Sequence, residues 1–387
     1  MSNTETGASA LRIALFSGNY NCVRDGANQA LNNLAAYALS QGAALRVYSP
    51  TVPQPDFAPN GDLVDVPAYP FPFGRGEYRL ARGMPAHVRT DLEAFAPNIV
   101  HVSAPDILGH RAVSWARKRG IPVVASVHTL FETYPAYYGL GFLERPLIAI
   151  LRRFYNRCDA LVVPNDDISA RLRGQGVTRP TSIWARGVNH ERFNPARRDY
   201  AWRRSLGIAD DELVIGFLGR LVLEKGLDVF ADVCAALRAR GVAHKVLIIG
   251  DGPAREGFAA DCPDAVLAGF QMGDDLGRAV AAMDIFLQPS VTEAFGNVTL
   301  EAMAAGVAVV AANATGARTL VEDGVTGHLI EPKDIAGYAD VIQAYAEDRA
   351  SLCAAGAAGR AASLAYDWDT INQKVVDVYC ATLAQAQ

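Results

Sequence analysis

Residue types that could do chemistry are concentrated between Ser290 and Gly306, where Glu293 and Glu301 are separated by seven positions. A short helix that begins near Asn297 and is closed by Gly306 would leave its first backbone amides unpaired, and such amides bind anions, phosphate above all. Two carboxylates would repel a phosphate, so they suit hydroxyl groups such as those of a ribose or a hexose. The stretch therefore predicts a site for a phosphorylated, hydroxyl-rich ligand. A surface loop with two solvated glutamates is the simpler alternative.

A second stretch carries positive charge, because Arg220 and Lys225 follow the glycine that ends an expected strand, Gly219. Two cations in a loop between a strand and a helix can neutralise a diphosphate. An ordinary exposed basic loop explains the same spacing. Neither the GxxxxGK[ST] motif nor the GxGxxG motif occurs in the chain. The turn Gly250–Pro253 after the next expected strand favours a plain connection from strand to helix.

The first half of the chain contains one histidine and one glycine that could contact a ligand. His128 follows the apolar run Val123–Val127, so it stands at the carboxyl end of an expected strand. There it could polarise or hydrogen-bond a reacting group, although a histidine satisfied by structural hydrogen bonds fits the same position. Gly26 precedes an expected helix at Asn28–Ser40, and its lack of a side chain would let the backbone approach a ligand closely.

The elements that must position these residues follow a repeated pattern of short apolar runs and longer amphipathic segments. Apolar runs rich in β-branched residues, with helices between them, are typical of a parallel sheet covered on both faces. The expected strands are Arg12–Ser17, Leu45–Ser49, Ile99–Val102, Val123–Val127, Ala160–Pro164, Ser182–Ala185, Leu213–Leu218, Lys245–Ile249, Ala265–Ala268, Ile285–Gln288, Val307–Ala311 and His328–Ile330. The longest expected helix covers Gly337–Ala365.

The pattern stops near residues 189–198, where Pro195 interrupts it, and then starts again. This predicts an α/β protein of two doubly wound, parallel-sheet domains, residues 1–190 and 191–365. A last helix within residues 366–387 is expected to return to the first domain. Two such domains facing each other would leave a central cleft at the carboxyl ends of both sheets, where ligands of these folds bind.

Composition narrows the classes of function. The 387 residues carry a net charge of −5, which argues against a nucleic-acid binder held by phosphate contacts. None of the six cysteines forms a CxxC pair or a zinc-like spacing with histidine, so we expect reduced thiols in a cytoplasmic protein. The polar start lacks the pattern of a signal peptide, and no apolar window reaches the length of a membrane span.

Taken together, these stretches resemble the retaining GT-B glycosyltransferases of family 4, which use nucleotide-activated sugars. The resemblance runs from Arg12 to the C-terminal helix, and its most specific parts are the E-x7-E element and the loop from Arg220 to Lys225. Residues 316–332 match the usual end of the family's nucleotide-binding domain. Residues 123–195 look most like bacterial mannosyltransferases and sulfolipid or glycolipid synthases. That likeness is carried by His128, Thr129, Tyr134, Phe154–Asp159, Arg186–Asn189 and Phe193–Pro195.

The resemblance implies roles for the side chains named above. Arg220 and Lys225 would hold the donor diphosphate, and Glu301 would bind the ribose hydroxyls. Glu293 would bind the hydroxyls of the donor sugar, and His128 would sit near the reacting sugar. The rest of the implied donor site comprises Gly26 closing over the phosphates, Gly269 and Phe270 bordering the base, and the backbone amides of Phe295, Gly296, Asn297, Val298 and Thr299.

The implied reaction moves a hexose-type sugar, with retention, from a nucleotide diphosphate sugar to a lipid or saccharide hydroxyl by front-face displacement. No cofactor and no required metal are expected, because cationic side chains and helix amides would do the metal's work. The donor base, UDP or GDP, and the sugar stay open. Within the fold, a sugar-phosphate or glycogen-type synthase is an alternative. Outside transferases, the alternatives are a nucleotide-sugar-binding protein without activity and a UDP-sugar epimerase.

One expected helix in the first domain indicates a further partner, a membrane surface. Residues 142–157 place four arginines and a row of apolar residues on one helix, as in helices that lie on an anionic membrane surface. A core-packing helix with a basic solvent face is the alternative. We therefore expect a cytoplasmic protein whose candidate contact with the inner face of the membrane is this helix.

Overall fold

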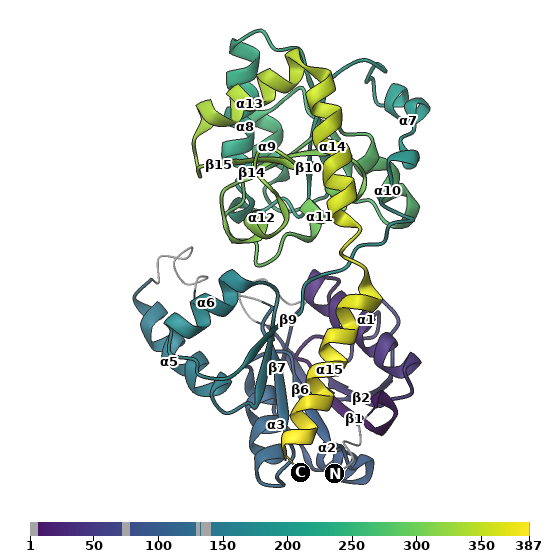
Figure 1. Ribbon diagram of the computed structural model, residues 1–387, viewed down its shortest axis with the longest axis vertical. Coiled ribbons are helices and arrows are strands. Elements are labelled where there is room, and N and C mark those ends of the chain that lie inside the picture. Colours follow the sequence, from purple (N-terminus) through teal and green to yellow (C-terminus); the bar gives the residue numbers. More distant parts are fainter. Residues whose placement is uncertain (1–6, 72–77, 129–131, 133–140, 387) are drawn as a thin grey trace, which may run out of the picture. The chain divides into compact units, whose positions relative to one another are not determined.

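The computed structural model of the chain describes residues 7–71, 78–128, 132 and 141–386. Its contacts group into two compact units, one of residues 1–186 with 368–387 and the other of residues 187–367. The C-terminal helix is thus grouped with the first unit. The sequence placed the corresponding boundaries at residues 190 and 365, a few residues from these positions. Figure 1 shows each unit as a sheet with helices around it.

Unit 1 is built on a seven-stranded sheet of order β3-β2-β1-β6-β7-β8-β9, in which every neighbouring pair is parallel. A short antiparallel hairpin, β4–β5, stands beside it. The strands are β1 Arg12–Phe16, β2 Ala44–Ser49, β3 Asp62–Asp65, β4 Ala68–Pro70, β5 Arg79–Ala81, β6 Ile99–Val102, β7 Val123–Ser126, β8 Ala160–Val163 and β9 Thr181–Ile183. The helices are α1 Gly26–Ser40, α2 Ala86–Phe95, α3 Ile107–Arg117, α5 Glu144–Tyr155, α6 Asp166–Gly174 and α15 Trp368–Ala386.

Helices cover both faces of the unit 1 sheet because its strands are apolar on both sides. One core joins α2, α3, α5 and α6 to the strands through buried residues such as Leu92, Val113 and Phe154. On the other face α15 lies against α1 and contacts β8 and β9 (Figure 1). A hydrogen bond of 2.6 Å from the Tyr37 hydroxyl to the Gln373 side chain joins the two helices.

Unit 2 repeats the design with a six-stranded parallel sheet of order β12-β11-β10-β13-β14-β15. Its core again brings helices and strands together, with Phe217, Phe230 and Leu287 among the buried residues. The strands are β10 Val214–Leu218, β11 Lys245–Ile249, β12 Val266–Gly269, β13 Ile285–Gln288, β14 Ala308–Ala312 and β15 Gly327–Ile330. The helices are α7 Tyr200–Ser205, α8 Leu227–Ala239, α9 Arg255–Asp261, α10 Gly273–Ala281, α11 Asn297–Ala304, α12 Thr315–Leu320, α13 Ile335–Glu347 and α14 Arg349–Ser363.

The prediction of one helix over Gly337–Ala365 was wrong. The segment forms two helices, α13 and α14, that meet at Asp348. The Asp348 side chain accepts hydrogen bonds from the amides of Ala350 and Ser351, so it caps a new helix instead of continuing the old one. Among the described residues, none of the helices combines the length and the apolar character that a membrane span needs.

Candidate functional site

The sheet order of unit 2 brings the sequence-predicted residues to one edge. Four neighbouring strands run β12-β11-β10-β13, and all are parallel, so their carboxyl ends lie side by side. Gly269 ends the first of these strands. Arg220 follows the third, and the loop with Glu293 follows the fourth. The unit 2 positions expected to bind the donor therefore share one sheet edge.

The turn that carries Arg220 is held by two glycines of the next turn. A Cβ on Gly250 would lie 1.9 Å from the Gly219 carbonyl oxygen, and one on Gly252 would lie 2.4 Å from that of Leu221. The Leu221 amide also donates to the Asp251 carbonyl at 3.0 Å. The turn after β11 is therefore more than the plain connection that the sequence favoured, because only glycines allow this close packing. It fixes the backbone of exposed Arg220.

Lys225 and Glu293 meet although 68 positions separate them, and their side chains form an ion pair. The pair is supported by the hydroxyls of Ser290 and Thr292, which each lie 3.3 Å from the Glu224 carbonyl oxygen. Both charged side chains are only partly exposed, at 26% and 20%. The loop before α11 and the loop after β10 thus form one charged surface.

Helix α11 begins at Asn297, as the sequence predicted, and it presents a free amino end. Gly296 precedes it with φ of +98°, and no side chain of the described residues caps its amides. Gly306 has φ of +72° and follows the helix, which confirms the expected glycine end. Unpaired first-turn amides carry partial positive charge and suit a phosphate.

Two buried polar groups beside this helix end lack partners within the described part of the chain. They are the hydroxyl of Thr299, in the first turn of α11, and the amide nitrogen of Gln288, the last residue of β13. These side chains are 1% and 2% exposed. Unsatisfied buried groups cost free energy, so they mark a place where a ligand or a water completes the site. Phe295 has a different role, since its buried ring packs on Tyr366 with centroids 6.0 Å apart.

Glu301 lies in the second turn of α11, and the pKa of its carboxyl is shifted from the usual value. Dense protein around this half-buried carboxyl removes water from it and raises its pKa to about 8, an effect that the charge of Arg192 partly offsets. The carboxyl is therefore protonated at neutral pH in the absence of ligand. A protonated carboxyl can donate one hydrogen bond as well as accept others, and so can match the hydroxyls of a sugar.

The expected border of the base is formed by Gly269 and Phe270. Gly269 has φ of +70°, and its carbonyl accepts the Gly250 amide at 2.9 Å, so it adjoins the turn that supports Arg220. Phe270 follows with 65% of its surface exposed. An exposed aromatic ring at the carboxyl edge of a sheet offers a flat apolar face to a planar ligand.

The residues expected in the first domain lie in unit 1, where His128 follows β7 and is enclosed by polar partners. Arg186 donates from its guanidinium to His128 Nδ1 at 2.7 Å, and Ser126 Oγ lies 2.7 Å from His128 Nε2. Arginine can only donate, so Nδ1 must be the acceptor and Nε2 must carry the proton. Burial and the charge of Arg186 lower the pKa of His128 well below its usual value, which keeps the ring neutral.

The chain of hydrogen bonds continues from Ser126 to the C-terminal helix. Ser126 Oγ lies 2.9 Å from Nε2 of His101, whose Nδ1 lies 2.5 Å from the hydroxyl of Tyr379 in α15. Burial lowers the pKa of His101 to about 3, so this ring is neutral as well. Both ring nitrogens of His128 are thus occupied. The arrangement supports an oriented, neutral imidazole and does not support a proton acceptor for a substrate.

Gly26 is the first residue of α1, and the preceding Asp25 caps that helix by accepting the Asn28 amide at 2.7 Å. Burial raises the pKa of Asp25, while the charge of Arg186 opposes this shift. The positive charge of Arg186 therefore influences both expected positions of unit 1, the amino end of α1 at Gly26 and the ring of His128. Thr129 and Tyr134 lie outside the described residues.

Comparison with known proteins identifies the group to which this chain belongs. A model described as Glycosyltransferase Family 4 matches residues 24–192, and one described as Glycosyl transferases group 1 matches residues 212–348. A GDP-mannose-dependent alpha-mannosyltransferase of Mycolicibacterium smegmatis is 33% identical over 299 residues, 76% of this chain and 76% of that protein. The chain belongs to the family 4 glycosyltransferases.

Two further relatives extend beyond the part that matches this chain. Sulfoquinovosyl transferase SQD2 of Arabidopsis thaliana is 31% identical over 318 residues, which are 80% of this chain and 61% of that protein. A GDP-mannose-dependent alpha-mannosyltransferase of Mycobacterium tuberculosis is 32% identical over 259 residues, 67% of this chain and 65% of that protein. The chain thus spans slightly less than two thirds of the length of these two relatives.

Solved structures confirm the GT-B fold of two parallel-sheet α/β domains that was predicted for this family 4 chain. Sucrose-phosphate synthase of Thermosynechococcus elongatus has a TM-score of 0.79 at 19% identity, over 96% of this chain and 99% of that one. WaaG, a glycosyltransferase involved in lipopolysaccharide biosynthesis, has a TM-score of 0.69 at 19% identity, over 95% and 99%. At such low identity these structures show the fold alone.

Sequence reasoning missed several polar groups of this family 4 chain. Thr299 lay within the expected helix but only its amide was considered, and Gln288 was assigned to a strand without a role. Ser126 stands two positions before His128, and in an extended strand this spacing places both side chains on one face, which was an available signal. His101 and Tyr379 come from distant elements, so no local pattern could have joined them to His128.

Proposed function

We propose that the protein is a retaining glycosyltransferase that moves a hexose-type sugar from a nucleotide diphosphate sugar to a lipid or saccharide hydroxyl. The observation that carries this proposal is the edge of the unit 2 sheet, where a free helix end, two cations and two carboxylates gather. Diphosphate needs positive charge and amide donors, and a sugar needs oxygen acceptors. This edge offers both kinds of partner on adjacent loops.

Each group of the edge has a defined task in the proposal. Arg220 and Lys225 bind the diphosphate, together with the first amides of α11. When the phosphate arrives, Lys225 shares its charge between the ligand and Glu293, whose freed oxygens accept sugar hydroxyls. Glu301 binds the ribose. Thr299 and Gln288 gain hydrogen-bond partners that they lack among the described residues.

The proposed chemistry is a front-face displacement. The bond between the sugar's anomeric carbon and the diphosphate oxygen breaks, and the acceptor oxygen bonds to the same face of that carbon. The acceptor's proton passes to the departing phosphate oxygen, so no protein base is required. Cationic side chains stabilise the charge that develops on the diphosphate, and we propose that no metal is required. The task of His128 is then to orient the sugar as a neutral ring.

Names of the relatives support a hexose-type donor. The proteins above use GDP-mannose or transfer sulfoquinovose, according to their names, and the Anabaena protein HepE was solved with UDP and glucose. HepE has a TM-score of 0.74 at 20% identity over 95% of this chain and 98% of that one. We infer that the sugar bound here is a hexose, with the base open between UDP and GDP.

Helix α5 supports the proposed membrane contact. Phe142 and Leu143 before the helix and Ile150 within it are 74%, 38% and 53% exposed. Arg145 and Arg153 lie on the same exposed surface, whereas Leu151 and Phe154 pack in the core. Exposed apolar side chains among arginines are typical of a helix in the interface of an anionic bilayer. We propose that α5 brings the enzyme to a lipid acceptor at the inner face of the membrane, and six free cysteines agree with the reducing cytoplasm.

The test of the proposed function begins with binding and ends with transfer. Melting temperature is measured with UDP- and GDP-sugars, since a ligand that binds only the folded state raises it. The stabilising donor is then incubated with lipid extract, and the glycosylated product is analysed for its anomeric configuration. Retained configuration supports the proposal. Binding without any transfer or hydrolysis favours the inactive nucleotide-sugar-binding alternative, and interconversion of free UDP-sugars favours an epimerase.

A further inference from the structure

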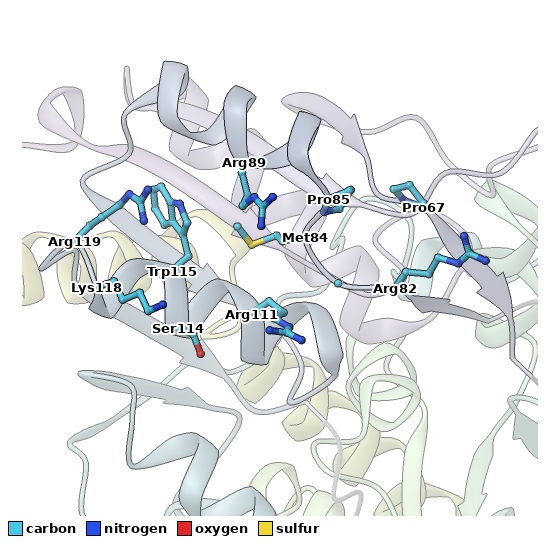
Figure 2. Close-up of a pocket in the computed structure, with 11 residues that line it drawn as sticks. Pro67, Arg82, Met84, Pro85, Arg89, Arg111, Ser114, Trp115, Lys118 and Arg119 are labelled. Carbon is cyan, nitrogen blue, oxygen red and sulfur yellow. The ribbon is translucent and has the colours of Figure 1, made fainter.

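A charged cavity lies in unit 1, and none of the residues assigned above lines it. It has a volume of about 640 Å³ and opens between the β4–β5 hairpin, the amino end of α2 and one side of α3. Figure 2 shows Arg89 of α2 and Arg111 of α3 on either side of Met84, with Arg119 beside Trp115. The family assignment gives no task to any of these side chains.

Positive charge dominates the lining. Arg82, Arg89, Arg111, Lys118 and Arg119 all border the cavity, and all are exposed. Glu93 pairs with Arg119, and within the described ranges no carboxylate pairs with the other four cations. Like charges around one cavity repel each other, so an anion that enters relieves this repulsion.

The remaining polar groups of the cavity are donors too. The indole nitrogen of Trp115 has no acceptor among the described residues, although the side chain is only 7% exposed. Helix α2 begins after Pro85 without a side-chain cap, so its first amides are also unpaired. The hydroxyl of Ser114 is already used, because it donates to the His110 carbonyl and accepts from Arg157. A ligand must therefore supply acceptors and negative charge.

We propose that this cavity binds a phosphate-bearing molecule through its phosphomonoester or diphosphate group. A phosphate offers several acceptor oxygens and about two negative charges, and arginines bind it with paired hydrogen bonds. Met84 and Trp115 form an apolar wall for the organic part of the ligand. The cavity exceeds the volume of inorganic phosphate, which fits a headgroup or a phosphorylated metabolite. The same chemistry can come from a lipid headgroup or from a free molecule.

The test uses the full chain with Arg220→Ala and Lys225→Ala, so that the proposed donor site does not contribute. Inorganic pyrophosphate and glycerol 3-phosphate are the soluble probes. Sedimentation with phosphatidylcholine vesicles, with or without phosphatidic acid, is the membrane arm. In low salt, a millimolar probe is expected to raise the melting temperature by about 1–3 °C, and added KCl is expected to reduce this shift.

Two matched double variants in this background locate the effect. Arg89→Ala with Arg111→Ala removes two cations from the cavity, and Arg173→Ala with Lys374→Ala removes two exposed helical cations elsewhere in unit 1. We expect the cavity variant to bind at least about tenfold more weakly, because two charge-assisted contacts are lost, and the control to bind as before. Equal melting temperatures without ligand show that both variants fold.

The two arms distinguish the source of the phosphate, and either can support the proposal. Binding of soluble probes that is lost only in the cavity variant assigns the site to a free phosphorylated molecule. Sedimentation with phosphatidic acid that is lost only in the cavity variant assigns it to a headgroup. Absence of both effects in the parent protein, or equal losses in the two variants, overturns the proposal, since the cations then contribute only general surface charge.

Discussion

The candidate sites of the two units are built in opposite ways. In unit 2, the edge around α11 carries unpaired donors, because its helix amides, Thr299 and Gln288 lack partners among the described residues. In unit 1, His128 is complete, because Arg186 and Ser126 occupy both ring nitrogens. The unit 2 edge has unpaired donors that a ligand could use, whereas the His128 ring in unit 1 is already held in one orientation.

This difference separates two tasks that the sequence alone could not separate. An edge with unpaired donors gains hydrogen bonds when a ligand arrives, so its residues should govern affinity for the nucleotide. A closed network gains little from a ligand but holds a ring in one place, so its residues should govern turnover. Mutations in unit 2 and unit 1 are therefore expected to affect different measurements.

The largest effect is expected from the cations of unit 2. Arg220→Ala or Lys225→Ala leaves the diphosphate without a charge-assisted partner, at a cost of about 2–4 kcal/mol in the transition state, or roughly 30- to 1000-fold in rate. Transfer kinetics with the donor that the melting-temperature screen selects measure this loss. Arg240→Ala and Lys245→Ala are the controls, since these side chains also pair with carboxylates of unit 2, Asp340 and Glu212. Activity near wild type in either clamp mutant removes the diphosphate assignment.

The next effect is expected in unit 1 from Ser126→Ala. The mutation leaves Nε2 of both His101 and His128 without a partner in a buried place, which costs about 1–3 kcal/mol of stability per group. A freed His128 ring loses its orientation, so turnover should fall by about 10- to 100-fold with donor affinity unchanged. Denaturant unfolding, calorimetry and kinetics separate these quantities.

Ser169→Ala is the matched control for unit 1. Ser169 is 3% exposed, and its hydroxyl pairs with Thr181 at 2.7 Å, away from His128. Its loss should lower stability without a specific loss of turnover. If both serine variants lose turnover equally, the closed network around His128 has only a structural role, and the contrast between the units disappears.

The sequence predicted those features that depend on local patterns. Apolar β-branched runs located the central strands, while β3 was missed because its sequence, Asp-Leu-Val-Asp, places a short apolar pair between charges. The end of α11 followed from Gly306, the glycine that closes it. The ion pair of Lys225 with Glu293 could not be predicted, because only the order of strands in the sheet brings the two loops together. The burial that shifts the pKa of Glu301 is likewise a property of the folded chain.

A smaller and sharper effect is expected from the two glutamates of unit 2. At pH 9, where the Glu301 carboxyl is ionised, Glu301→Gln should weaken binding of both free nucleoside diphosphate and the full donor by about 1–3 kcal/mol, because the ribose loses a charged acceptor. Glu293→Gln should leave nucleotide affinity almost unchanged and reduce turnover, because the sugar is no longer held in its reactive pose. Calorimetry with nucleotide and kinetics with donor measure the two effects. The reverse outcome would exchange the assigned roles.

The pKa of Glu301 makes the nucleotide effect depend on pH. Since the carboxyl ionises near pH 8, wild-type affinity should rise between pH 7 and 9 by about five- to tenfold, as the ribose gains a charged acceptor. The Glu301→Gln variant carries an amide that cannot titrate, so it should show no such rise. Calorimetric titrations of both proteins across this range provide the measurement, and the ratio of their affinities removes the titration of the nucleotide itself.

The same ionisation should appear in stability. The pKa of Glu301 is raised from 4.5 to about 8 on folding, so the folded chain binds more protons than the unfolded chain between these values. Stability contributed by this group is therefore present below pH 4.5 and falls as pH rises towards 8. Glu301→Gln should flatten that slope. An unchanged slope would show that the carboxyl is better solvated than its position in α11 indicates.

The smallest effect is expected from removal of metal. If Arg220, Lys225 and the amides of α11 stabilise the leaving diphosphate, EDTA should leave the transfer rate within about twofold. The measurement compares initial rates after EDTA treatment with rates after readdition of Mg²⁺ or Mn²⁺. A control with a metal-dependent glycosyltransferase shows that the chelator works under the same conditions. Complete loss of activity that Mn²⁺ restores would mean that the cations of unit 2 do not suffice to stabilise the diphosphate. The unpaired groups of the unit 2 edge would then be part of a metal site.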